Sequence, residues 1–370
     1  FVNAAGINAN TQMTFFGQEK VEYNAQLCLM NMAVHGLNGR IVSGDEANSF
    51  YHDAFNLAGK CDYVIANPPF NVDKVKSESA FSAGRLPFGL PGVNVKTKEV
   101  GNANYLWINY FYAYLNERGR AGFVMASSAT DSSLSLPCSL WFFDKAKREE
   151  NRDKVLFIDA RKYYTVVDRT LNEWTEWQLL NLQAIVHLYR GETDKYQALL
   201  EKYNHDISEA VNSISEEALP FVSLLDSDTA CQFNSSLAWL SSPWNNYDEL
   251  SKNLNGQIEQ IKSCVKLAEE RLKKRELKSM RLAGDKFCKV LEEILTIIGE
   301  HEWLTGKFGK GKYNDIAGLC KIATLDEIEE KNYSLTPGAY VGVPEAEDDG
   351  VDFHERMNEI HAELAKLHEE

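Results

Sequence analysis

The sequence has no long apolar run, no closely spaced cysteine pair and no surplus of basic residues. Its apolar stretches are far shorter than the roughly 20 residues that a membrane-spanning helix needs. The opening Phe1-Val2-Asn3 does not begin a basic and then apolar leader. We therefore expect no association with a membrane and a cytoplasmic location.

The seven cysteines are scattered along the chain and include no Cys-x-x-Cys pair. This spacing argues against both a disulfide framework and a zinc site. We expect reduced thiols and no bound metal.

The net charge is −15, which is unfavourable for a protein that binds nucleic acid without a partner. Nonspecific affinity for DNA comes mainly from Lys and Arg side chains that neutralise phosphates. If this chain acts on DNA, we expect another subunit to hold the duplex. The length of 370 residues, with 44% hydrophobic residues, is typical of a chain with two or three folded units.

In the first 145 residues, short apolar runs alternate with segments of helical spacing. Such alternation predicts the α/β class, with a doubly wound, Rossmann-like parallel sheet whose ligands bind beyond the carboxyl ends of the strands. Each predicted helix is followed by a glycine stop signal, Gly36 or Gly119. The predicted strands are residues 13–17, 39–43, 61–66 and 121–125, and the predicted helices are residues 22–35 and 105–117.

The sequence predicts a mostly helical region between residues 174 and 306. Apolar residues recur at steps of three and four from Leu250 to Leu272, which predicts one long helix with an apolar stripe. The stripe either packs inside its own domain or forms a seam for a partner subunit. A turn at 336–338 and an acidic linker at 345–350 precede a predicted final helix that starts at Val351.

The stretch with the clearest chemistry is Asn67-Pro68-Pro69-Phe70, which directly follows the apolar run 61–66. The side-chain carbonyl of Asn67 and the backbone carbonyl of Pro68 can each accept one N–H of a planar amine, which aims the nitrogen lone pair at a methyl donor. Two prolines restrict the backbone, and Phe70 offers a flat face on which an extruded base can stack. The alternative is a structural Pro-Pro turn after a buried strand.

Together with this motif, five further segments resemble the amino-methyltransferases, and among them the modification subunits of type I restriction-modification systems. The resemblance covers much of the chain and implies transfer of a methyl group from S-adenosylmethionine to N6 of a flipped adenine in DNA. The five segments are Phe15 to Glu19, Gly101 to Trp107, Gly119 to Val124, Phe157 to Lys162 and Leu335 to Gly342.

The family pattern implies roles for individual residues. Asn67, Pro68, Pro69 and Phe70 would be catalytic, and Asn67 would also touch the cofactor. Glu19 resembles the acid that accepts hydrogen bonds from the ribose hydroxyls of the cofactor, the alternative being a helix-start glutamate.

Three other polar residues fit the pattern with competing structural roles. Asp45 resembles the carboxylate that binds the adenine amine of the cofactor, whereas a turn aspartate can equally cap the following helix. Asn102 and Asn104 either line the cofactor or base pocket, or cap the helix that follows them.

The chain also departs from the family pattern. A glycine-rich loop that contacts the methionine part of the cofactor is expected directly before Phe1, with a helical domain before it, and neither is in this sequence. A second discontinuity falls at Ser132-Ser133-Leu134, where a further wall of the base pocket is expected.

The resemblance also implies a domain division and a set of partners. We expect a methyltransferase domain at 1–173, a helical region at 174–311, and a C-terminal segment at 312–370 for subunit assembly. The implied partners are DNA, a specificity subunit, a restriction subunit and a second copy of the modification subunit. Alternative functions are N-methylation of glutamine or of RNA adenine, and a noncatalytic role in assembly.

Overall fold

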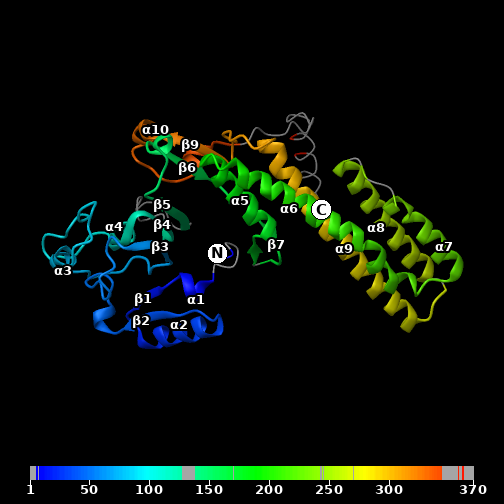
Figure 1. Ribbon diagram of the computed structural model, residues 1–370, viewed down its shortest axis with the longest axis horizontal. Coiled ribbons are helices and arrows are strands. Elements are labelled where there is room, and N and C mark those ends of the chain that lie inside the picture. Colours follow the sequence, from blue (N-terminus) through cyan, green and yellow to red (C-terminus); the bar gives the residue numbers. More distant parts are fainter. Residues whose placement is uncertain are drawn as a thin grey trace. The chain divides into compact units, whose positions relative to one another are not determined.

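The chain forms two compact units in the computed structural model (Figure 1). Unit 1 comprises Phe1–Asp153 and Thr324–Ala339, and unit 2 comprises Lys154–Ala323 and Tyr340–Glu370. The structure describes residues 6, 8–126, 138–169, 171–241, 244, 246–269, 271–343, 357 and 361. The predicted discontinuity at 132–134, the predicted acidic linker at 345–350 and all of the predicted final helix except residues 357 and 361 therefore lie outside the described residues.

The first part of unit 1 alternates strands and helices, as the sequence predicts. Its helical elements are α1 (Ala9–Gln12), α2 (Glu22–Val34), η1 (Asp45–Ala47), α3 (Ser77–Ser82), α4 (Ala103–Tyr114) and η3 (Glu149–Asn151). Its strands are β1 (Phe15–Glu19), β2 (Gly39–Ser43), β3 (Cys61–Ala66), β4 (Leu115–Ala126) and β5 (Cys138–Asp144). The later helix α10 (Leu325–Glu330) returns to this unit, and α11 (Gly338–Val341) spans the last division between units.

The described strands of unit 1 make two small sheets. β1 and β2 pair in parallel from Phe15↔Gly39 to Glu19↔Ser43. β3 pairs in parallel with β4, and β5 runs antiparallel to β4. The mixed α/β class is thus confirmed. Because the strands described here are divided between two sheets, one continuous doubly wound sheet stays a prediction.

Helix α4 covers one face of the β3–β4–β5 sheet. Side chains in a strand alternate between the two faces, and in β4 every second residue from Ala121 to Met125 is buried against this helix. The ring centroids of Phe111 in α4 and Phe123 in β4 lie 4.9 Å apart. The opposite face of the sheet exposes Ile65 and Phe142.

The predicted boundaries of the first helix are nearly correct, and those of the second are wrong. Helix α2 ends at Val34, and Gly36 adopts a φ of +64°, the left-handed conformation of a helix stop. Helix α4 already ends at Tyr114, and Gly119 lies inside β4. A register shift between Cys61 and Tyr63 of β3 makes β4 bulge there, and a Cβ on Gly119 would lie 2.7 Å from the Cys61 carbonyl oxygen. This glycine therefore permits close strand approach and does not stop a helix.

Unit 2 is mainly helical, as predicted for this region. Its helices are α5 (Glu176–Tyr189), α6 (Thr193–Val222), α7 (Ser227–Ser236), η4 (Ala238–Ser241), α8 (Tyr247–Glu269) and α9 (Lys274–Phe308). Two short strand pairs join β6 (Lys154–Ile158) to β9 (Cys320–Thr324) and β7 (Thr165–Val166) to β8 (Asn172–Glu173). No helix within the described ranges combines the length and the apolarity that crossing a membrane requires.

The apolar stripe that begins at Leu250 packs inside unit 2. Leu250, Leu254 and Ile261 are buried with residues of α6 and α9 in one hydrophobic cluster. The helix that carries them ends at Glu269, so Leu272 falls in the turn before α9. Packing within unit 2 therefore accounts for the burial of these side chains. An interface with a partner subunit is not needed to explain the apolar stripe.

Candidate active site

The loop Asn67–Phe70 begins directly after β3, at the carboxyl end of a strand that is paired in parallel with β4. Asn67 and Pro69 are exposed, Pro68 is buried and Phe70 is half-buried. The amide of Asn67 is thus open to the surface, while the first proline anchors the loop in the fold. A loop at this place in a parallel sheet is where α/β proteins commonly bind ligands.

Helix α4 contacts this loop through hydrogen bonds. The indole Nε1 of Trp107 donates to the backbone carbonyl oxygen of Pro69 at 3.1 Å. The side-chain oxygen of Asn104 accepts the backbone N–H of Asn71 at 2.8 Å, and its Nδ2 donates to Asn71 Oδ1 at 2.9 Å. The backbone just after Phe70 is therefore held by a buried helix.

Glu19 and Asp45 lie together at the carboxyl end of the other parallel pair. Glu19 is the last residue of β1 and pairs with Ser43, the last residue of β2, two positions before Asp45. The Oε1 of Glu19 accepts the backbone N–H of Val21 at 2.8 Å. Asp45 is exposed and opens the short helix η1, after Gly44 with a φ of +90°. The glycine allows the turn that brings the aspartate to this end of the strand.

The structure thus forms two groups of predicted site residues, both within unit 1. One group is Glu19 with Asp45, and the other is the Asn67–Phe70 loop. Each group follows the carboxyl ends of parallel strands, but the two strand pairs belong to separate sheets. Gln18 ties β1 to the segment after Asp45, because its side chain bonds the carbonyl of His52 at 3.1 Å and the N–H of Ala54 at 3.0 Å.

A sequence model of the N-6 DNA Methylase family matches residues 2–132 and 132–216, more than half of the chain. The chain belongs to this family. The two matched segments meet at residue 132, where the sequence also predicts a discontinuity. Membership in the N-6 DNA methylases supports chemistry that uses a methyl donor.

Curated relatives extend the similarity over nearly the whole chain. The Type I restriction enzyme MjaIX methylase subunit of Methanocaldococcus jannaschii is 27% identical in an alignment that covers 99% of this chain and 49% of the relative. The Type I restriction enzyme HindI methylase subunit of Haemophilus influenzae is 22% identical, over 98% of this chain and 60% of the relative. The chain therefore spans about half to three fifths of the length of these relatives.

Of the two asparagines before α4, one is a helix cap and the other is not. Asn102 is the N-cap, and its side chain accepts the backbone N–H of Asn104 at 3.1 Å. Asn104 is 2% exposed and contacts the loop after Phe70. Capping was therefore the correct alternative for Asn102. The contact of Asn104 with Asn71, and that of Trp107 with Pro69, were not predicted, since nothing in the local sequence marks them.

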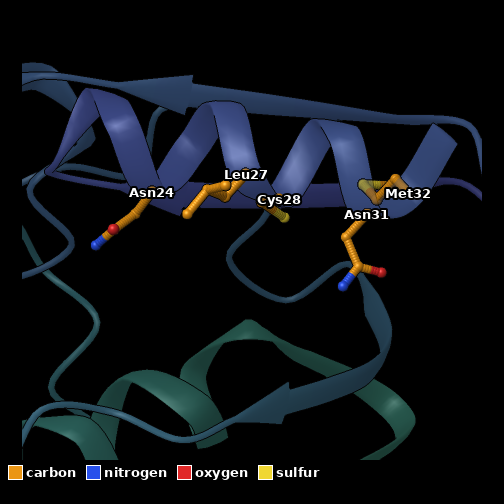
Figure 2. A pocket seen from close by; sticks show the side chains of 5 residues that line it. All are labelled: Asn24, Leu27, Cys28, Asn31 and Met32. Atoms are coloured by element: carbon orange, nitrogen blue, oxygen red, sulfur yellow. The ribbon is translucent and has the colours of Figure 1, made fainter. Parts of the chain in front are cut away.

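A shallow hollow on α2 is separate from the predicted site residues. It is lined by Asn24, Leu27, Cys28, Asn31 and Met32, and Figure 2 shows Asn24 and Asn31 pointing away from the helix. In the part of the chain that the structure describes, no three His, Cys, Asp or Glu side chains gather as a metal site would need. Within this N-6 DNA methylase domain, the strand-end loops are thus the candidate site.

Proposed function

We propose that this chain is the catalytic part of an adenine-N6 DNA methyltransferase, the modification subunit of a type I restriction-modification system. The observation that carries the proposal is the Asn67–Phe70 loop, which follows a parallel strand and leaves the Asn67 amide open to the surface. Family membership and the similarity to methylase subunits of type I restriction enzymes support it. The finer fold assignment, a doubly wound Rossmann-like methyltransferase sheet, belongs to the same proposal.

In the proposed reaction the target adenine leaves the DNA stack and its N6 amine meets two acceptors. The Asn67 side-chain oxygen takes one N–H and the Pro68 backbone oxygen takes the other. This arrangement draws the nitrogen toward tetrahedral geometry and directs its lone pair toward the methyl donor. Phe70, which is half-buried, stacks on the flipped base. Pro69 restricts the backbone between them.

The residues at the β1–β2 strand ends fit part of a binding site for S-adenosylmethionine, which supplies an electrophilic methyl group when bound. Glu19 uses Oε1 for the Val21 N–H, and among described residues its Oε2 has no hydrogen-bond partner, so Oε2 can accept a ribose hydroxyl. Asp45 is exposed and can accept an adenine amine. Asn67, in the loop after β3, completes the proposed set.

We further propose that the chain acts within an assembly. The partners are a specificity subunit that reads the DNA sequence, a second copy of the modification subunit, and a restriction subunit for cleavage. A net charge of −15 favours this arrangement, since another subunit must supply most of the phosphate contacts. Segments 1–173, 174–311 and 312–370 are the proposed methyltransferase, helical and assembly regions.

The test is methylation of duplex DNA by the full-length subunit together with its specificity partner, with the product nucleoside identified by mass spectrometry. We expect N6-methyladenine, and we expect the subunit alone to bind and modify DNA poorly. Asn67→Ala should abolish transfer because the amine acceptor is lost. S-adenosylmethionine should still bind, because Glu19 and Asp45 remain as the main cofactor contacts of the proposal.

Other products separate the alternative functions. If the assay yields methylated RNA or a methylated glutamine side chain and leaves DNA unmodified, the substrate is one of these other planar amines and not DNA. An intact assembly that shows no calorimetric binding of S-adenosylmethionine would favour the noncatalytic role. Wild-type turnover by Asn67→Ala would remove the role of the loop in orienting the amine.

A further inference from the structure

The prolines of the Asn67–Phe70 loop fix only part of its backbone. Each proline ring locks its own φ, and a residue that precedes proline is also restricted in ψ. Asn67 and Pro68 both precede a proline, so their carbonyl directions are limited by the sequence alone. Pro69 is followed by Phe70, and the ψ of Pro69 is therefore left free. The position of the Phe70 ring depends on something other than the prolines.

Trp107 constrains the Pro69 carbonyl, which is the group that the free ψ angle would swing. Its indole N–H donates to this oxygen at 3.1 Å. The indole is 8% exposed, its centroid lies 4.4 Å from that of Phe50, and it stacks on Phe111 at 5.9 Å. The packed ring has little room to move, so the donor is a fixed point for the loop.

Asn104 constrains the backbone on the other side of Phe70. Both ends of its amide bond to one residue, Asn71, at 2.8 and 2.9 Å. Asn71 has a φ of +54°, a left-handed conformation that asparagine tolerates better than most residues. Asn104 is 2% exposed, so water has little access to its amide and does not compete strongly for either hydrogen bond.

We infer that Trp107 and Asn104 are positioning residues, which hold Phe70 between two anchored backbone groups so that its ring meets the flipped base. The inference rests on the proposed function and goes further in naming residues that act through their contacts with the loop. Both residues act through the loop, and their loss lowers turnover more than it lowers binding of the methyl donor.

Helix α4 offers a matched control. Asn109 is also a fully buried amide of this helix, and its side chain holds a different loop by accepting the N–H of Phe88 at 2.9 Å and donating to Gly89 O at 3.3 Å. Asn104→Ala and Asn109→Ala thus remove the same group from the same helix. Only the first change releases the residue after Phe70.

The experiment compares Asn104→Ala, Trp107→Phe and Asn109→Ala in the full-length methylase with its specificity partner. We expect Asn104→Ala to lower kcat about 100-fold, the size of effect that a displacement near 1 Å can cause, and Trp107→Phe to lower it about 10-fold. The Kd for S-adenosylmethionine should stay within about twofold in both. Asn109→Ala should lower Tm as much as Asn104→Ala while kcat changes less than about twofold.

Three further readouts separate positioning from general loss of structure. Asn104→Asp keeps the acceptor for the Asn71 N–H, and the Asn71 amide can turn to donate, so kcat should recover. DNA with 2-aminopurine at the target base should show weaker flipping fluorescence in Trp107→Phe than in wild type. Hydrogen exchange at the Asn71 amide should accelerate in Asn104→Ala and not in Asn109→Ala, whether or not the enzyme is active.

Each outcome supports or overturns the inference. Equal losses of kcat in Asn104→Ala and Asn109→Ala would overturn it, as would wild-type kcat in Trp107→Phe. If Asn67→Ala is inactive in the same assays, the proposed function still stands. If the wild-type assembly transfers no methyl group, the proposed function fails and takes the positioning role with it.

Discussion

In unit 2 the long helices turn an apolar stripe inward, whereas in unit 1 one helix and one sheet face leave large apolar side chains exposed. Helix α9 buries eight residues along its length, from Met280 to Phe308. Helix α2 is also rich in apolar residues but buries only Ala25. On the open face of the β3–β4–β5 sheet, Ile65 is 83% exposed and Phe142 is 74% exposed.

This difference separates the parts of the chain that fold by their own packing from those that keep apolar surface in contact with water. In unit 2 the helices α6 to α9 form a bundle, and their apolar side chains pack against one another in one hydrophobic core. In unit 1 the core lies between α4 and one face of the β3–β4–β5 sheet, and the Asn67–Phe70 loop follows the end of β3 in this sheet. We therefore expect stability to depend on the bundle core and on the α4 side of the sheet, and little on the open face.

The largest effect should come from the bundle core. Phe287 in α9 is 2% exposed and meets Phe233 edge to face at 6.4 Å between centroids. Phe287→Ala should lower the free energy of unfolding by about 3–5 kcal/mol, because it removes buried surface and leaves a cavity. Chemical denaturation followed by circular dichroism measures this loss.

The same helix provides the control for that prediction. Leu282 is 57% exposed, and Leu282→Ala should change the free energy of unfolding by less than about 0.5 kcal/mol. Similar losses from the two substitutions would show that the bundle does not bury one face selectively, and the contrast with unit 1 would disappear.

A smaller effect should come from the covered side of unit 1, and it should depend on pH. Tyr110 of α4 is 1% exposed and donates to the carbonyl oxygen of Phe50 at 2.8 Å. Burial raises the pKa of Tyr110 to about 12, although the Arg85 guanidinium opposes the shift. Because the folded pKa is above the ordinary value, the folded state holds this proton more tightly. The resulting stability is present below pH 10 and is lost as the pH rises toward 12.

The measurement is the free energy of unfolding of wild type and Tyr110→Phe between pH 8 and pH 11.5. With the pKa raised from 10.0 to about 12, linkage gives a loss of about 2 kcal/mol in wild type by the upper end of this window. Tyr110→Phe lacks the ionisable group, so its decline should be shallower by that amount. Parallel declines in the two proteins would mean that the Tyr110 phenol is not protected from solvent in the folded state.

The sequence predicted structure best where the cause is local. Strands β2 and β3 have the predicted bounds, and Gly36 marks the end of α2 because a left-handed residue is needed there. Gly119 misled the prediction, since its role depends on the Cys61 carbonyl in another strand. The Asn67–Phe70 loop was recognisable from four adjacent residues. The bonds from Asn104 and Trp107 span 33 and 38 positions, and no local pattern announces such contacts.

The smallest effect should come from the open face of the sheet, where two neighbouring residues of β3 give a direct comparison. Val64 points toward α4 and is half-buried in its cluster, and Ile65 points to the other side. Val64→Thr places a hydroxyl against the core and should cost about 1–2 kcal/mol. Ile65→Thr keeps a β-branched residue in the strand and should cost less than about 0.5 kcal/mol. If thermal denaturation finds Ile65→Thr at least as costly as Val64→Thr, the second face of the sheet is covered in solution, and unit 1 buries its apolar residues as fully as unit 2.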